Sequence, residues 1–145
     1  MKIFNTPFEN SLRLLLILSA DPETAKSVDK IAALDFIAIY AKNFGYSEQS
    51  LQGESPNNNP SEFATRRELA VIAIKQLVMR GLASIVKNAN GFCYKINSNG
   101  ILVADSLDTE YVDDYMAIAR VVIERTATYT ERQLFALINS TRRIE

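Results

Sequence analysis

The sequence predicts a mostly α-helical fold with one small β-hairpin, a winged helix-turn-helix with extra helices at its N- and C-terminal ends. Two observations predict it. A helix-forming segment, TRRELAVIAIKQLVMRG, ends at Gly81, and two β-prone segments follow it around an Ala89-Asn90-Gly91 turn. Apolar segments with helix-start signals lie before and after it. We therefore place a winged-helix domain at residues 1–125, with the hairpin at 83–97, and a helical extension at 126–145.

The composition argues against an enzyme. The 145 residues include no histidine, which excludes Ser-His, Cys-His and His-metal sites, and the five glycines are scattered, so no phosphate loop is present. We expect no catalytic residue, cofactor, metal or small-molecule substrate. The single cysteine, Cys93, fits a reducing cytoplasm. No signal peptide is recognisable, and the longest apolar run, Leu14 to Leu18, is too short to span a membrane.

The first helix is expected to begin at the capping box Thr6-Pro7-Phe8-Glu9 and to end near Ala20. Its apolar residues cover almost its whole circumference, so it should be a central, buried element. Arg13 is the exception. We expect its stem to pack in the interior while its guanidinium reaches the surface or a carboxylate.

The second helix is predicted from Val28 to about Phe44, with Ser27 as its cap. Asp35 lies within its apolar face and needs a partner if it is buried. The candidate partners are Arg13, Arg66 and Arg67. We interpret the contact as a structural ion pair, because no second carboxylate lies beside Asp35 at helical spacing.

A long inserted loop is predicted at residues 45–63. These 19 residues, GYSEQSLQGESPNNNPSEF, are rich in Gly, Ser, Asn and Pro and exceed the usual length of a connection. Such a segment is either mobile or a docking loop, and the sequence leaves both open. Its sizeable apolar residues, Tyr46 and Leu51, are candidate contacts with a partner.

The third helix, from about Ser61 to Arg80, is the element that would read DNA bases in a winged helix, so its residues test that interpretation. When residues are placed at 100° steps around the helix, most of its apolar side chains lie on one broad face: Leu69, Ala70, Val71, Ala73, Ile74, Leu77 and Val78. The side chains left to face solvent are Glu68, Ile72, Lys75, Gln76 and Met79. A recognition helix normally offers more base-reading donors, and it follows a turn of about three or four residues, far shorter than this loop.

Two further helices are predicted after the hairpin and a short apolar helical piece. Asp108 should cap a helix from Thr109 to about Arg125, whose stripe begins with Tyr111 and Tyr115 and suits either the core or a wet interface. A second capping box, Thr130 to Gln133, opens a last amphipathic helix that contains Phe135. The side chains at 111, 115 and 135 are the remaining candidate partner contacts.

The charge is unevenly distributed along the chain. Residues 65–100 hold six Lys or Arg and one acid, while the whole chain holds 16 basic and 17 acidic residues. Phosphate contacts by Lys75, Arg80, Lys87 and Lys95 are therefore a hypothesis.

Several short motifs occur in a characteristic order along the chain. They are FNTPFENSLRLLLIL, Leu34-Asp35-Phe36, Ser50-Leu51, Glu62-Phe63 through Arg66-Arg67, Arg80-Gly81-Leu82 and Tyr111-Val112. Through them the chain, over about residues 3–125, resembles the middle component of ABC three-component systems, a family that includes the small winged-helix subunits of Lamassu-type antiphage and anti-plasmid defence. The resemblance implies a non-enzymatic subunit that joins an SMC- or Rad50-type ATPase to an effector, often a nuclease.

Two functions follow as hypotheses. The first is an adaptor within a hetero-oligomer of ATPase and effector, with non-specific DNA contact by the hairpin lysines as an addition. The second is a sequence-specific winged-helix repressor. An independent enzyme is the remote third, because the carboxylates from Asp108 to Asp114 lie at a helix start, where the helix dipole explains them.

Overall fold

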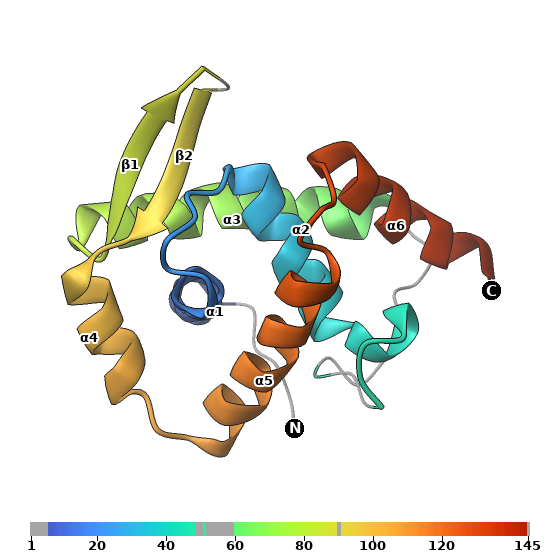
Figure 1. Cartoon of the computed structure of the whole chain (residues 1–145), viewed down its shortest axis with the longest axis horizontal. Coiled ribbons are helices and arrows are strands. Elements are labelled where there is room, and N and C mark those ends of the chain that lie inside the picture. Colours follow the sequence, from blue (N-terminus) through green and yellow to red (C-terminus); the bar gives the residue numbers. More distant parts are fainter. Residues whose placement is uncertain (1–5, 49–50, 52–59, 90, 145) are drawn as a thin grey trace.

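The computed structural model describes residues 6–48, 51, 60–89 and 91–144. Over these residues the chain is mostly helical, with one antiparallel two-stranded hairpin (Figure 1), so the predicted mostly α fold with a small hairpin is confirmed. The elements are α1 (Pro7–Ala20), α2 (Val28–Ile39), η1 (Ala41–Phe44), α3 (Pro60–Met79), β1 (Ala83–Asn88), β2 (Gly91–Ile96), α4 (Ser98–Ser106), α5 (Glu110–Arg125) and α6 (Glu131–Ile144).

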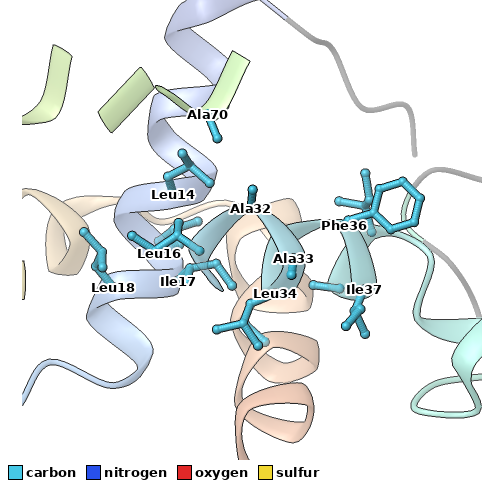
Figure 2. Packing of buried hydrophobic residues seen from close by; sticks show 14 of the residues in the cluster. Leu14, Leu16, Ile17, Leu18, Ala32, Ala33, Leu34, Phe36, Ile37 and Ala70 are labelled. Carbon is cyan, nitrogen blue, oxygen red and sulfur yellow. The ribbon is translucent and has the colours of Figure 1, made fainter. Parts of the chain in front are cut away.

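Helix α1 forms the centre of the fold, as its all-round apolar sequence predicts. It contacts α2, α3, α4, α5 and β2. Every residue from Leu14 to Leu18 is buried. Figure 2 shows Leu16 and Ile17 beside residues of α2, with Ala70 of α3 beside Leu14. Burial of each such Leu or Ile stabilises the fold by roughly 1.5–3 kcal/mol relative to leaving it exposed.

The predicted helix caps are confirmed at three of four positions. Thr6 Oγ1 accepts from the backbone N–H of Glu9 at 3.2 Å, and Ser27 Oγ accepts from Lys30 at 3.1 Å. The last capping box is reciprocal, because the backbone N–H groups at 130 and 133 each bond to the other residue's side chain, at 2.7 and 3.1 Å. Such caps satisfy backbone donors that the first turn leaves unpaired.

The fourth cap prediction was wrong. Helix α5 is capped by Thr109, whose Oγ1 accepts from the N–H of Val112 at 3.1 Å, and not by Asp108. The extended backbone of Thr109, with φ −133° and ψ 159°, places its hydroxyl over the first turn.

The second helix is shorter than predicted. It ends at Ile39 and is followed by the tighter turn of η1, which closes at Gly45 with φ 78°. The ring of Phe44 then lies edge-on to that of Phe36, 6.5 Å between centroids. Residues 49–50 and 52–59 of the predicted loop lie outside the described residues, and α3 begins within that loop, at Pro60.

The root of the hairpin is fixed to both flanking helices. Gly81, with φ 76°, ends α3 in a left-handed conformation, and the N–H of Leu82 bonds to the carbonyl of Leu77 at 2.9 Å. Asn97 then connects the two helices: its Nδ2 donates to the Gly81 carbonyl at 2.9 Å, and its Oδ1 accepts from the N–H of Gly100 at 2.9 Å. The strands therefore leave the helical body in a defined direction.

The last helix packs on the rest of the chain. Helix α6 contacts α2, and its Leu134 and Ile138 are buried. The ring of Phe135 meets that of Phe63 at 5.5 Å between centroids, which joins α6 to α3. Helix α5 packs against both α1 and α2.

Candidate interaction surface

The β1–β2 hairpin extends beyond the helices, with its tip well clear of them (Figure 1). Its strands pair in the register Ala83 to Ile96 and Asn88 to Gly91, and the φ of 105° at Gly91 suits glycine at the tight turn. Asn90 lies outside the described residues. At the root, Ala83 and Ile96 are buried, whereas all of β1 beyond Ala83 is exposed. Most of the hairpin is thus available to another molecule.

The two faces of the hairpin both carry apolar side chains. The register puts Ile85 opposite Tyr94 on one face and Val86 opposite Cys93 on the other, because neighbouring residues of a strand point to opposite sides. Ile85 is 52% exposed and Phe92 is 60% exposed. Adjacent apolar residues on a projecting two-stranded hairpin cannot all face the core, which is the sequence signal that identifies this surface.

Helix α3 adds a second exposed apolar set. Its buried stripe is narrower than predicted and consists of Ala70, Ala73, Ile74 and Leu77. Val71, which was predicted to lie on the buried face, is exposed, as is Ile72, and Met79 is 85% exposed. The prediction for Val71 was wrong because α1 and α2 cover only one side of α3, so the rest of its broad apolar face meets solvent.

The four basic residues predicted for DNA contact do not form one compact patch. Lys75 and Arg80 are exposed on α3 and just after it. Lys87 and Lys95 project from opposite faces of the hairpin, as the register requires. The ammonium of Lys87 lies 5.9 Å from the centre of the Phe92 ring, and Lys95 Nζ is 3.9 Å from a carboxylate oxygen of Glu23.

The residues predicted for partner contact serve mainly within the chain. Tyr115 and Leu51 are buried within the chain, and their contact with a partner stays a prediction. Tyr111 is half-buried with its ring 6.2 Å from that of Tyr115, and Phe135 packs between elements as described above. Tyr46 is half-buried, and the guanidinium of Arg125 lies 6.0 Å from the centre of its ring. A helical stripe alone does not distinguish a face that meets another part of the chain from one that meets a partner.

A charged cluster lies at the centre of the fold. Arg13 Nε donates to Asp35 Oδ1 at 3.0 Å and Nη2 donates to Oδ2 at 3.2 Å, and the Tyr115 hydroxyl donates to Oδ1 at 2.6 Å. Arg13 Nη2 also donates to Asn10 Oδ1 at 2.8 Å. Burial alone lowers the pKa of Arg13, but the charge and hydrogen bond of Asp35 outweigh it and raise that pKa. Asp35 of α2 thus accepts hydrogen bonds from side chains of both α1 and α5.

The other two arginines proposed as partners of Asp35 make different ion pairs. Arg66 Nε lies 3.2 Å from Glu62 Oε2 on the same helix, and Arg67 Nη2 lies 2.9 Å from Asp29 Oδ1 of α2. The Tyr40 hydroxyl donates to the same Glu62 oxygen. Burial, followed by this bond to Glu62, raises the pKa of Tyr40 to about 12. The Arg67 ion pair joins α3 to α2, and the Tyr40 bond joins α3 to the C-terminal end of α2.

The comparison with known families decides the assignment. The ABC-three component (ABC-3C) system Middle Component 2 family matches residues 3–143 of the chain. The chain belongs to the ABC-3C Middle Component 2 family. Comparison with curated proteins and with solved structures gave no match. As a middle component, the chain is one part of a multi-component system, which implies protein partners.

An open pocket of this middle component lies between α1, α4 and α5. Its volume is about 340 Å³, and Leu16, Val112 and Met116 line it together with Asp105, Asp113 and Arg120. Among the described residues no group of three or more Cys, Asp or Glu is placed to hold a metal. No helix in the described part of the chain has both the length and the apolar character needed to cross a membrane.

Proposed function

We propose that this middle component is a non-enzymatic adaptor in a bacterial defence complex of the Lamassu antiphage and anti-plasmid type. It would join an SMC- or Rad50-like ABC ATPase to a nuclease-type effector. The order α1, α2, α3, β1, β2 supports a winged helix in which α3 occupies the position of the recognition helix. The family assignment supports the requirement for protein partners.

One observation carries the proposal. Where a recognition helix would offer Arg, Asn or Gln to base edges, α3 exposes Val71, Ile72 and Met79. The hairpin next to it in the chain exposes Ile85 and Phe92. Apolar side chains left exposed in this number, among polar neighbours, are typical of a surface that binds protein.

The charged interior supports a non-enzymatic role. Arg13, Asp35 and Tyr115 are buried and satisfy one another. The space that Arg13 and Asp35 line, about 10 Å³, has room for no more than about one water molecule, so a substrate could not react there. The cluster fixes α1, α2 and α5 relative to one another. That is the rigidity required of a subunit that must hold two partners at once.

Co-purification with the adjacent gene products tests the proposal. The tagged chain is co-expressed with the products of the genes that flank its own, among which the proposal requires an ATPase and an effector, and is isolated at physiological salt. We expect both to be retained, and Met79→Asp to weaken binding about tenfold or more, as loss of a central apolar contact does. Leu102→Asp is the matched control, because Leu102 is 69% exposed but lies on α4. Failure of either partner to co-purify with the unaltered chain contradicts the adaptor role.

The alternative is a sequence-specific repressor. It is favoured by the exposed Lys75, Arg80 and Lys87, for which the described residues provide no carboxylate. Its affinity for DNA would fall steeply with salt. A gel-shift series that identifies one operator, with discrimination lost on Gln76→Ala or Lys75→Ala, would replace the adaptor with the repressor.

Non-specific DNA contact by the hairpin is a separable part of the proposal. Charge reversal at both Lys87 and Lys95 tests it. We expect the complex assembled with the double variant to show lower DNA-stimulated ATPase activity than the complex assembled with the unaltered chain. Unchanged stimulation would remove the DNA contact from the proposal and leave the adaptor role in place.

A further inference from the structure

The two outer edges of the hairpin differ. On the β2 side, the N–H of Lys26 donates to the Tyr94 carbonyl at 3.0 Å and the N–H of Tyr94 donates to the Lys26 carbonyl at 2.8 Å. The chain at Lys26 thus pairs with the outer edge of β2 through a single antiparallel bridge. On the other side, no strand in the described part of the chain pairs with β1. Strand β2 is therefore central, and β1 is an open edge.

The register identifies the backbone groups that β1 presents. In an antiparallel pair, facing residues alternate between those that bond to each other and those whose N–H and C=O groups point away from the pair. Tyr94 uses both of its groups on Lys26, so it belongs to the second kind, and so does Ile85, which faces it. Two residues further along β1, Lys87 follows the same rule. Ile85 and Lys87 thus point their backbone donors and acceptors outward at the spacing that an added strand requires.

The side chains of this edge are those of a binding strand. Natural proteins usually protect an open edge with proline, a bulge or several charges. From Ser84 to Asn88, β1 has no proline, pairs with β2 without a bulge and carries one charge, at Lys87. Ile85 on one face and Val86 on the other would each contact a side chain of an incoming strand.

Charge indicates the composition of that strand. Lys87 lies on the edge itself, and Arg80 and Lys95 lie on the turn before β1 and on β2. A segment that places apolar residues beside Ile85 and Val86 and a carboxylate beside Lys87 matches all three positions. A second copy of the chain fits less well, because it would bring the same basic hairpin alongside this one.

We propose that the open edge of β1 binds an extended segment of a partner subunit, apolar with an acidic residue, as an added β-strand. This inference rests on the proposed adaptor role, since that role supplies the partner. It specifies backbone pairing at Ile85 and Lys87, which contact through side chains alone would not produce.

Hydrogen exchange in the assembled complex tests the inference without any substitution. Amide exchange of the full chain is measured at single-residue resolution, alone and in the complex with the co-expressed ATPase and effector. We expect the Ile85 and Lys87 amides to exchange at least about tenfold more slowly in the complex, because an added strand bonds them. A complex that forms while both amides exchange as fast as in the free chain overturns the added strand and leaves the adaptor role intact. Absence of any complex overturns the adaptor role and the inference together.

A pair of substitutions at one position separates backbone from side chain. Ile85→Pro and Ile85→Thr both remove the isoleucine, but only proline removes the outward N–H, and proline is tolerated where that group faces away from the sheet. We expect Ile85→Pro to weaken partner binding about tenfold more than Ile85→Thr does. Equal binding by two variants that circular dichroism shows to be folded would overturn the inference. A dimer of the chain alone, with protected Ile85 and Lys87 amides in the absence of partners, would assign the edge to a second copy and also overturn it.

Discussion

The hydroxyl of Tyr115 on α5 donates a 2.6 Å hydrogen bond to Oδ1 of Asp35 on α2. The same carboxylate is paired with Arg13 of α1 through both of its oxygens. All three side chains are buried, so one acceptor connects three helices in the interior. A buried charged group stabilises the fold only while all of its hydrogen-bond and ion-pair partners are present.

Removal of the tyrosine hydroxyl should destabilise the chain measurably. We expect Tyr115→Phe to lower the free energy of unfolding by about 1.5–3 kcal/mol, because a hydrogen bond to a charged group is lost while the ring still fills its site. Urea denaturation measures the change. Tyr94→Phe is the control, since Tyr94 is half-buried and its hydroxyl has no bond within the described structure; it should stay within about 0.5 kcal/mol. Equal effects of the two variants would contradict the role assigned to the Asp35 bond.

Breaking the ion pair from one side should cost more than replacing both partners. Arg13→Met leaves the Asp35 carboxylate buried with its main partner gone, and we expect a loss of about 3–5 kcal/mol. Adding Asp35→Leu removes that orphan charge and should recover part of the loss. Urea unfolding of the two single variants and the double variant gives the coupling between the residues. A double variant less stable than both singles would show that the pair itself, and not the unpaired charge, governs stability.

Alkaline pH should unfold the chain through its buried tyrosines. Burial, and then the Asp35 charge, raises the pKa of Tyr115 well above 10.0, and burial raises that of Tyr111 to about 12. Because the folded-state pKa values lie above the unfolded value, this stability is complete below pH ~10 and is lost as pH rises through the folded-state values. Tyr115 alone contributes a slope of about 1.4 kcal/mol per pH unit there. Burial lowers the pKa of Lys26 below 10.5, so its contribution to stability rises with pH up to 10.5, opposite to that of the tyrosines.

Unfolding midpoints in urea between pH 9 and pH 11.5, in steps of about half a unit, measure this dependence. The Tyr115→Phe variant should lose stability less steeply over the same interval, because one raised tyrosine is absent. A slope unchanged by that substitution would mean that Tyr115 ionises in the folded chain as readily as in the unfolded one.

The docking of α6 should depend on a single arginine of α3. The guanidinium of Arg67 lies 5.1 Å from the centre of the Phe135 ring and 5.9 Å from that of Phe63. Its ion pair with Asp29 is partly exposed and contributes little, so the ring contacts should dominate. We expect Arg67→Lys to cost about 0.5–1 kcal/mol, because an ammonium cannot stack as a planar guanidinium does.

Hydrogen exchange of the backbone amides in α6 measures this effect locally. The amides of residues 134–140 should exchange faster in Arg67→Lys, while those of α1 should not change. The exposed Arg132 on the same helix is the control, and Arg132→Lys should leave α6 unaltered. Unchanged α6 exchange in Arg67→Lys would show that Leu134 and Ile138 alone hold the helix.

Local signals made most of the fold predictable from sequence. The caps at Thr6, Ser27 and Thr130 depend on residues within one turn, and Gly81 ends its helix by its own conformation. The hairpin likewise follows from its turn and its β-prone strands. The cap at Thr109 shows the limit, because two adjacent residues of suitable type differ only in backbone geometry.

Contacts between elements distant in the sequence could not be predicted in the same way. Arg13, Arg66 and Arg67 were equivalent candidates for Asp35, and only the packing of α1 on α2 brings Arg13 to it in the bidentate pair. The exposure of Val71 and the burial of Tyr115 have the same origin, since periodicity defines a helical face but does not say what covers it. The interaction surface of α3 and the hairpin was therefore recognisable only in part, from the adjacent Ile85 and Val86.

A glycine at the hairpin root should tolerate no side chain. A Cβ added at Gly100 would lie 2.2 Å from the Leu82 carbonyl oxygen and 2.6 Å from Ile96 Cγ1. Neither contact can be relieved by a flexible side-chain end, so α4 must shift away from the strands. We expect Gly100→Ala to cost about 1–3 kcal/mol, as overpacking does, even though alanine favours helix. Asn99→Ala, on an exposed neighbour in the same turn, should change stability by less than about 0.5 kcal/mol. Urea denaturation compares the two, and exchange at the Leu82 and Ile96 amides should rise only in Gly100→Ala. A Gly100→Ala chain as stable as the unaltered one would mean that α4 does not press on the strands, and that the direction of the hairpin is set by the Asn97 bonds alone.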